Sequence, residues 1–479
     1  MHVRKQSPLI PRLSMSRQPN STDARTASVT RQSDQEQATA SQAIAERYRR
    51  VRAFTRQLCA SLEPEDCVIQ SMPDASPIRW HLAHTTWFFE TFILKEFFAG
   101  YCPFASDYAY LFNSYYNALG DQFPRARRGL LSRPTLREVW SYRDEIDQRI
   151  QTALNTNAFV QRSENLALIE LGIEHEQQHQ ELMLTDIKHA FSCNPLFPIF
   201  RADGCDGETS TDQSAKRLQT RSYPGGLTEI GHVAGDGLTY AFAYDNEIPR
   251  HTVYIQPFGL DSRTVTCGEY LQFIEDGGYR RPELWLSEGW GQVTSEKWNA
   301  PNYWLQRDGQ WHEFTLAGLQ PLALARPVCH VSYFEADAYA RWAGARLPTE
   351  FEWEHAAANA RVSAASAPAA LASGPAAFAD QLLAAQQTIH PQAVTDRWDD
   401  FGDLMGNVWE WTSSSYAPYP GYRPSGGAIG EYNGKFMCNQ YVLRGGSCAT
   451  SSDHIRISYR NFFPAHARWQ FSGVRCARD

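Results

Sequence analysis

The chain has 479 residues, more than one typical core holds, and this length predicts at least two domains. Its 45 Lys and Arg against 53 Asp and Glu give a net charge of −8, which argues against a general nucleic-acid binder. It has no apolar run of about 18 residues that would span a membrane, and its ten cysteines include no C-x-x-C pair, so we expect reduced thiols in a cytoplasmic protein.

The N-terminal segment is rich in Ser, Arg, Gln and Thr and poor in apolar residues. It lacks the apolar centre of a secretory signal. We therefore expect a disordered tail over residues 1–42, and an Arg-rich organelle transit peptide is the alternative.

Apolar residues recur every three or four positions in four segments, which is the spacing of one helix face: residues 44–58, 76–94, 135–154 and 168–186. The second segment opens with Ser76 and Pro77, an N-cap followed by proline in the first turn. The third opens with Thr135 and Glu138, a capping-box pair. Four such helices predict a helix bundle over residues 43–200. Its connection at 99–133 exceeds a simple turn, and such loops are often functional.

The composition of the sequence changes after residue 200, where the helical spacing of apolar residues ends. Residues 201–223 are polar, which predicts a linker. Residues 224–479 contain short β-like runs at 252–255 and 441–444 and a brief helix at 332–343, which predict an α+β domain with much irregular structure. An Ala-rich insertion covers residues 360–387, and we assign it no chemistry.

Three histidines lie on the apolar faces of the predicted bundle helices. His175 and His179 are four residues apart, so their imidazoles point to the same side of one helix. His84 shares a face of the second helix with two tryptophans, and a buried imidazole needs a partner. Three imidazoles on one ion suit an open iron site that also holds substrate and O2, or a catalytic zinc with one water. Spacing alone does not choose between these metals. Histidines that are satisfied in the core are the alternative, and Glu176 gives only a weak match to the H-E-x-x-H protease motif.

The long loop adds residues that suit an amino-acid substrate. Arg125, Arg127 and Arg128 carry guanidinium groups that bind carboxylates in a bidentate manner. Tyr115 and Tyr116 carry hydroxyls that deliver or accept a proton. An exposed basic loop is the alternative interpretation of the arginines.

Motifs in both halves resemble the ergothioneine-biosynthesis sulfoxide synthases, also called hercynine oxygenases. In the first half they are WHLAHTTWFFE at 80–90, NSYY at 113–116, FPR at 123–125, RGLLSRP at 128–134 and HEQQH at 175–179. In the second half they are RLPTEFEWE at 346–354, GNVWEW at 406–411, RGGS at 444–447 and FSGVR at 471–475. The resemblance implies a DinB-like four-helix bundle followed by a C-type-lectin-like domain related to formylglycine-generating enzymes.

The resemblance also implies a role for each site residue. The Fe(II) ligands would be His84, His175 and His179. The hercynine site would be formed by Gln178, Asn461, Phe462 and Phe463, whose aromatic faces suit a trimethylammonium group. The carboxylate of the sulfur donor would bind Arg125 and Arg128. The active-site tyrosine would be Tyr115 or Tyr116, whereas in one branch of the family it comes from the second domain.

The implied activity is an Fe(II)- and O2-dependent oxidoreductase that joins the sulfur of cysteine, or of γ-glutamylcysteine, to C2 of hercynine and oxidises it to a sulfoxide. The tyrosine pair resembles the branch that accepts free cysteine. We expect small-molecule substrates, no nucleic-acid or membrane partner, and a monomer or weak homo-oligomer.

Four other functions each account for part of the sequence. A paralogue on the same framework makes selenoneine from a selenosugar, and fold alone does not exclude it. A zinc-dependent thiol transferase would explain the histidines but not the second domain. A formylglycine-generating oxidase needs two cysteines where this chain has Thr450 and Ile455, with only Cys448 nearby. A non-enzymatic binding module leaves the histidine triad unexplained, and we expect Trp409 and Trp411 to lie in its core.

Overall fold

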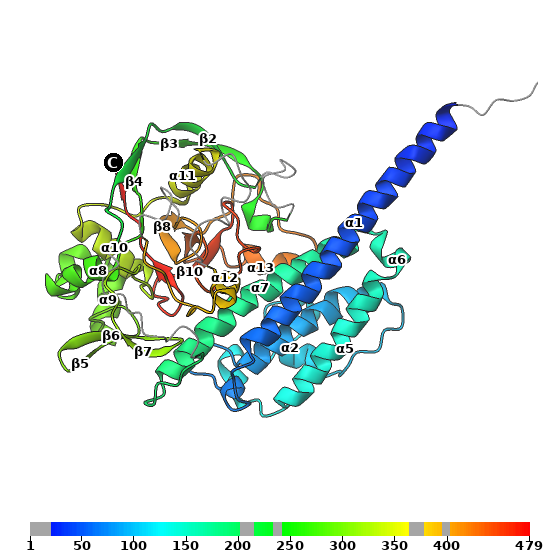
Figure 1. The fold of residues 1–479 in the computed structure, drawn as a ribbon, viewed down its shortest axis with the longest axis horizontal. Helices are drawn as coiled ribbons and strands as arrows, with labels where there is room; N and C mark the ends of the chain where they lie inside the picture. The colour runs from blue at the N-terminus through cyan, green and yellow to red at the C-terminus, as the bar shows by residue number, and fades with distance from the viewer. Residues whose placement is uncertain (1–20, 202–214, 233–241, 364–377, 395–402) are drawn as a thin grey trace, which may run out of the picture.

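The computed structural model describes residues 21–201, 215–232, 242–363, 378–394 and 403–479. A helical half and a mixed half lie against each other, with the long helix α7 between them (Figure 1). No described helix combines the length and apolar character needed to cross a bilayer. The nine cysteines in the described ranges are all free thiols, as the sequence predicts.

Four long helices form the bundle: α1 (Ser21–Leu58), α2 (Ile78–Phe89), α5 (Leu136–Leu154) and α7 (Ser163–Ser192). Helix α1 packs on α7, and α2 packs on both α5 and α7. Their apolar stripes meet in one core, where Tyr48, Phe89 and Ile146 are fully buried. The predicted bundle class is therefore confirmed, and the capping box of Thr135 and Glu138 begins α5.

Helix α2 differs in detail from the prediction. It begins at Ile78 with Pro77 in the cap position, and no side chain caps it. The Ser76 hydroxyl instead accepts a hydrogen bond from Arg128 at 2.9 Å. The predicted helix 76–94 continues beyond α2 as a π-helical turn, η2 (Glu90–Leu94), and then α3 (Lys95–Phe97). Every residue of α2 is buried, which suits a helix at the centre of the bundle.

The prediction of a disordered tail over residues 1–42 differs from the structure from Ser21 onward, because α1 begins there. Residues 1–20 lie outside the described ranges. The physical reason is that the chain contains neither proline nor glycine between Ser21 and Leu58, so nothing local ends the helix before it leaves the bundle. The N-terminal part of α1 extends away from the rest of the molecule (Figure 1).

The connection between η2 and α5 contains only short helices: α3, α4 (Tyr108–Phe112), η3 (Asn117–Leu119) and η4 (Arg125–Leu130). Its helix α4 packs on α2. A further short helix, α6 (Asn157–Val160), joins α5 to α7.

The described part of the second half contains four small sheets, as expected for an α+β domain with much irregular structure. Their strand orders are β10-β9-β8-β11, β1-β4-β12, β2-β3 and β5-β6-β7. The strands of the first sheet are β8 (Trp409–Ser415), β9 (Gln440–Arg444), β10 (Asn461–Pro464) and β11 (Ser472–Gly473). Those of the second are β1 (Thr220–Tyr223), β4 (Phe258–Asp261) and β12 (Ala477–Arg478).

The remaining strands are β2 (Gly226–Ile230), β3 (His251–Ile255), β5 (Trp304–Arg307), β6 (Gln310–Thr315) and β7 (Gly318–Pro321). The helices are α8 (Cys267–Glu275), α9 (Ser287–Glu296), α10 (Tyr333–Trp342), α11 (Glu350–Ser363), α12 (Ala379–Ala384) and α13 (Glu431–Gly434). Strands β3 and β9 and helix α10 confirm the three elements that the sequence predicts there.

Two segments are more ordered than their composition suggests. Strand β1 occupies the end of the predicted linker 201–223, because it pairs with β4. Helix α12 lies inside the Ala-rich insertion 360–387, where Leu382 and Leu383 are buried against the bundle core. The parts of these segments at 202–214 and 364–377 lie outside the described residues.

Helix α7 joins the two halves. The core around it includes Phe314, Leu316 and Phe471 from the second half, so one apolar cluster crosses the boundary. Trp409 and Trp411 are buried in the second half, as predicted for core residues. The consequence is that residues of α7 contact both the bundle interior and the second half.

Candidate metal centre and substrate cavities

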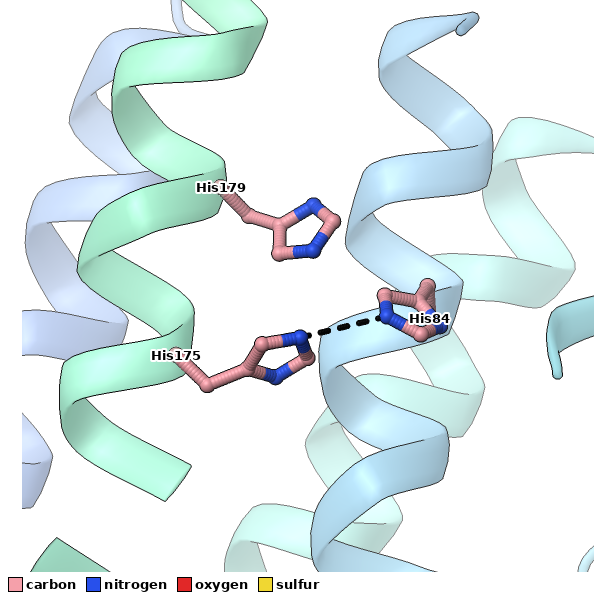
Figure 2. Close-up of side chains that lie close together, drawn as sticks. All are labelled: His84, His175 and His179. Atoms are coloured by element: carbon pink, nitrogen blue, oxygen red, sulfur yellow. Dashed lines mark hydrogen bonds between the residues drawn. The ribbon is translucent and has the colours of Figure 1, made fainter. Parts of the chain in front are cut away.

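The structure brings His84, His175 and His179 together. His84 projects from α2, and the other two project from α7 one turn apart, so all three rings face one another between the helices (Figure 2). Their ligand nitrogens lie within 4.8 Å of one another. His84 Nε2 and His175 Nε2 are 3.2 Å apart. Two nitrogens bound to one ion at about 2.1 Å lie about 3.0 to 3.4 Å apart for octahedral to tetrahedral angles, so the separation suits a shared metal without choosing its geometry.

Hydrogen bonds orient the ring of His84. Its Nδ1 lies 2.6 Å from the carbonyl oxygen of Phe112. A carbonyl only accepts, so Nδ1 carries the proton and Nε2 presents its lone pair to the other histidines. Trp80 stacks on the same ring with 4.6 Å between centroids, which fixes its plane.

His179 is oriented by a chain of two further residues. Its Nδ1 lies 2.8 Å from Nδ1 of His81, and Nε2 of His81 lies 3.0 Å from Oδ2 of Asp186. A carboxylate accepts, so His81 donates from Nε2 and accepts at Nδ1 from His179. This arrangement leaves Nε2 of His179 as the nitrogen available to a metal.

The donor set fits a divalent metal ion. Burial lowers the pKa of His175 to about 4 and holds the pKa values of His84 and His179 well below the usual range, with the neighbouring imidazoles adding to the effect. All three rings are therefore neutral at pH 7, which is the form that binds metal. Nδ1 of His175 is buried without a hydrogen-bond partner in the described part of the chain.

A second group of potential ligands, Glu313, Cys329 and His390, lies at the boundary of the two halves. Glu313 accepts from His390 at 2.9 Å, and the ammonium of Lys188, itself 2.7 Å from His330 Nε2, interacts electrostatically with the same carboxylate. Lys188 and Glu313 therefore already balance in charge, and a buried ammonium would repel a cation. This cluster is better explained as a polar contact that positions α7.

Glu176 does not face the triad. Its carboxylate is fully buried and accepts from Arg52 at 2.9 Å, from Thr55 at 2.6 Å and from Arg143. These groups lie on α1 and α5, so Glu176 ties three bundle helices together. The arginines hold the pKa of its carboxyl far below the usual range against the effect of burial. The weak similarity to the H-E-x-x-H motif therefore has no catalytic counterpart here.

Glu181, two residues after His179, is one of the residues that fix α7 to the second half. Its carboxylate accepts from Trp409 at 2.6 Å, and from Ser447 and Thr450 at 2.8 Å each. No basic residue is among these hydrogen-bond partners, and burial raises the pKa of the carboxyl. The second half thus sets the position of the ligand-bearing helix.

A small cavity of about 50 Å³ adjoins the triad. The loop residues Tyr115, Tyr116, Arg125 and Arg128 all line it, so the structure brings them beside the triad. Arg128 is buried beneath Trp80, whereas Arg125 is exposed and donates to the Tyr115 hydroxyl at 2.9 Å. Arg127, also considered from the sequence, is exposed and does not line the cavity.

A larger cavity of about 190 Å³ lies next to it, between α7 and the second half. Its lining includes the residues expected to contact hercynine: Gln178, Asn461, Phe462 and Phe463. Gln178 donates to the Tyr459 hydroxyl at 2.8 Å, and Phe462 stacks on Tyr416 at 4.1 Å. The structure therefore brings residues almost 300 positions apart to one cavity. A third cavity, of about 400 Å³, is lined by both His175 and Gln178.

Four residues at these cavities were not singled out as site residues from the sequence: His81, Asp186, Tyr432 and Tyr459. His81 stands one turn before His84 and could have been noticed by its spacing. Tyr432 lines all three cavities from the second half, and no local pattern marks it.

Comparison with known proteins agrees with this architecture. Residues 47–183 match the DinB superfamily model, and residues 207–479 match the model of the sulfatase-modifying factor enzyme 1-like domain. A formylglycine-generating enzyme of Streptomyces coelicolor is 28% identical over 53% of this chain and 88% of its own length. The fold and site thus define a DinB-like histidine bundle fused to a formylglycine-generating-enzyme-like domain.

Two relatives match nearly the whole chain. The hercynine oxygenase of Mycolicibacterium smegmatis is 32% identical, covering 86% of this chain and 92% of the relative. That of Mycobacterium tuberculosis is 31% identical, covering 90% and 97%. The chain belongs to the hercynine oxygenase family.

Proposed function

We propose that the protein is a non-heme Fe(II)-dependent sulfoxide synthase of ergothioneine biosynthesis, which joins the sulfur of cysteine to C2 of hercynine using O2. The observation that carries the proposal is the juxtaposition of the neutral triad with two cavities lined by complementary groups. The family relatives named hercynine oxygenase support the choice of substrate.

The overall reaction balances. As the C–S bond forms, hercynine loses the hydrogen at C2 and cysteine loses the hydrogen of its thiol. O2 accepts the electrons that these two bonds release. One oxygen atom of O2 becomes the sulfoxide oxygen, and the other leaves as water with the two hydrogens. No reductant is needed. The iron, held by His84, His175 and His179, would supply the redox chemistry and bring both substrates and O2 together.

The loop residues would hold the sulfur donor. Arg128 is 3% exposed, and its Nε has no hydrogen-bond partner in the described part of the chain. Its side chain donates to the hydroxyls of Ser76 and Ser114 at 2.9 and 3.0 Å, so it has no carboxylate of its own there. Burial lowers its pKa to about 9. A donor carboxylate would offset this cost, and Arg125 at the rim would assist.

The larger cavity would hold hercynine. Phe462 and Phe463 present aromatic faces suited to a trimethylammonium group, and Gln178 offers a side-chain amide for a hydrogen bond. Gln178 follows His175 by three residues on α7 and lines the third cavity together with it, so a ligand held by Gln178 would lie close to the triad. The protein's contribution is thus the orientation of two substrates in one geometry.

One reconstitution experiment tests the function. The full chain would be loaded anaerobically with Fe(II), then exposed to O2 with hercynine and a mixture of cysteine, γ-glutamylcysteine and a selenosugar. We expect the sulfoxide of the cysteine conjugate by mass spectrometry, dependent on Fe(II) and O2. Product from the selenosugar would identify the selenoneine-forming alternative, and thiol transfer with Zn(II) without O2 would identify a transferase.

Replacing both Tyr115 and Tyr116 with phenylalanine is expected to divert turnover from the sulfoxide to cysteine sulfinate, because both tyrosines line the cavity at the triad and would supply its proton. The ratio of the two products by mass spectrometry is the measurement. Tyr110→Phe, an exposed change on the same loop, is the control. Unchanged sulfoxide yield in the double variant would refute this role, and diversion by Tyr432→Phe instead would move the role to the second half.

A further inference from the structure

We propose that Asp186 binds the α-ammonium group of the sulfur donor, so that the enzyme selects a free α-amino acid over donors whose cysteine nitrogen is an amide. This inference rests on the proposed function and concerns a residue for which that function has given no substrate contact. It would make the small cavity a receptor for both charges of a zwitterion.

The two carboxylate oxygens of Asp186 differ in the hydrogen bonds that they accept. Oδ2 accepts from His81 Nε2 at 3.0 Å and from the backbone N–H of Ser76 at 2.7 Å. Oδ1 is buried and has no hydrogen-bond partner among the described residues. The side chain is 5% exposed. An unpaired anionic oxygen at such a position is costly, which points to a cationic group that the bound state supplies.

Asp186 lies beside the proposed carboxylate site. Both Asp186 and Arg128 line the 50 Å³ cavity together with the triad. Ser76 connects them, since its N–H donates to Asp186 and its hydroxyl accepts from Arg128. The two charged groups do not form an ion pair within 4.0 Å in the described ranges. Each therefore keeps an unsatisfied atom, one anionic and one cationic.

This pair matches the head group of an amino acid. The carboxylate and ammonium of an α-amino acid stand on one carbon, so they need an adjacent cation and anion. A cysteine held this way would carry its thiol on the third carbon toward His84, His175 and His179, which line the same cavity. In γ-glutamylcysteine the cysteine nitrogen is an uncharged amide, so it would leave Asp186 without a counter-charge.

The bonds of Oδ2 explain why Oδ1 stays available. His81 and Ser76 both donate to Oδ2, so a rotation of the Asp186 carboxylate would break both hydrogen bonds. The same bonds link the donor site to His179 through His81. Asp186 is thus held in place by the residues that orient a metal ligand.

The first test changes the ligand rather than the protein. Binding of cysteine, 3-mercaptopropionate and γ-glutamylcysteine to the Fe(II)-loaded full chain with hercynine would be measured by anaerobic titration calorimetry. 3-Mercaptopropionate keeps the thiol and carboxylate but lacks the amino group. We expect it to bind about tenfold or more weakly than cysteine, the effect of losing one charged hydrogen bond. Equal affinities of cysteine and 3-mercaptopropionate would overturn the proposal.

The second test is Asp186→Asn, which keeps an oxygen acceptor for His81 and Ser76 but places an amide N–H₂ at the free position. We expect cysteine to bind this variant as weakly as 3-mercaptopropionate, whose own affinity stays unchanged. Equal weakening of both ligands would overturn the proposal, because it would indicate a purely structural role. Iron content of the variant reports whether His179 is still oriented. Asp144→Asn, an exposed change on α5, is the matched control.

Failure of this inference is distinct from failure of the proposed function. If hercynine and cysteine yield the sulfoxide while 3-mercaptopropionate binds as well as cysteine, only the role of Asp186 is refuted. If neither thiol yields product with hercynine, the proposed function itself fails.

Discussion

Replacing any one of His84, His175 and His179 with alanine is expected to lower iron affinity by about two to three orders of magnitude, an estimate that divides the binding free energy of a protein metal site among its ligands. Sulfoxide formation should fall with it. Iron per protein after desalting, measured by plasma mass spectrometry, tests the first part, and product formation at saturating iron tests the second. The physical reason is that two histidines from α7 and one from α2 would share one ion.

The same variants should remain folded. The rings line the small cavity together with polar groups such as Ser76 and Arg128, so their removal leaves space that water can enter. Circular dichroism and melting temperature close to those of the unaltered chain would separate loss of metal from loss of fold. His466→Ala, an exposed histidine outside the cavities, is the control. Full iron occupancy in a single alanine variant would contradict the assignment of that ligand.

Replacing Glu176 with alanine is expected to destabilise the bundle by about 3 to 5 kcal/mol, because Arg143 would remain buried without its carboxylate partner and Arg52 would keep only Asp147. For a unit of this size the melting temperature should fall by about 6 °C or more. Differential scanning calorimetry with and without metal would measure the change. Glu164→Ala, an exposed change on the same helix, should have little effect.

The Glu176 variant also separates a structural glutamate from a catalytic one. A general base contributes about 10² to 10⁴ in rate, so its loss would abolish turnover even in folded protein. We expect instead that folded Glu176→Ala or Glu176→Gln at low temperature keeps its iron and most of its activity. A large loss of activity in a variant of unchanged stability would contradict this interpretation.

Much of the fold follows from local patterns. The spacing of apolar residues predicts the bundle helices, the box of Thr135 and Glu138 predicts the start of α5, and the tryptophans of GNVWEW are core residues as expected. Composition was a poorer guide. Strand β1 and helix α12 lie in segments that look like linker and insertion, because pairing with β4 and burial of Leu382 order them. Such tertiary contacts override weak local preference.

The candidate site shows the same division. His84, His175 and His179 were recognisable because helical periodicity places each on an inward face. The spacing of His81, three residues before His84, does not reveal its role, because that role depends on its hydrogen bonds to His179 and Asp186. Tyr432 carries no local signal at all, since its place at the cavities depends on how the second half packs on α7.

By itself the sequence determined the class of the protein, the helices that carry the histidines and the loop that carries the arginines and tyrosines. Local periodicity and motif are enough for these features, because backbone geometry repeats. Only the tertiary structure decided that Glu176 ties helices together, that Glu181 holds α7 to the second half, and that Oδ1 of Asp186 is left unpaired beside Arg128. Partners of buried charges are chosen by packing between distant segments, and a linear spacing does not encode them.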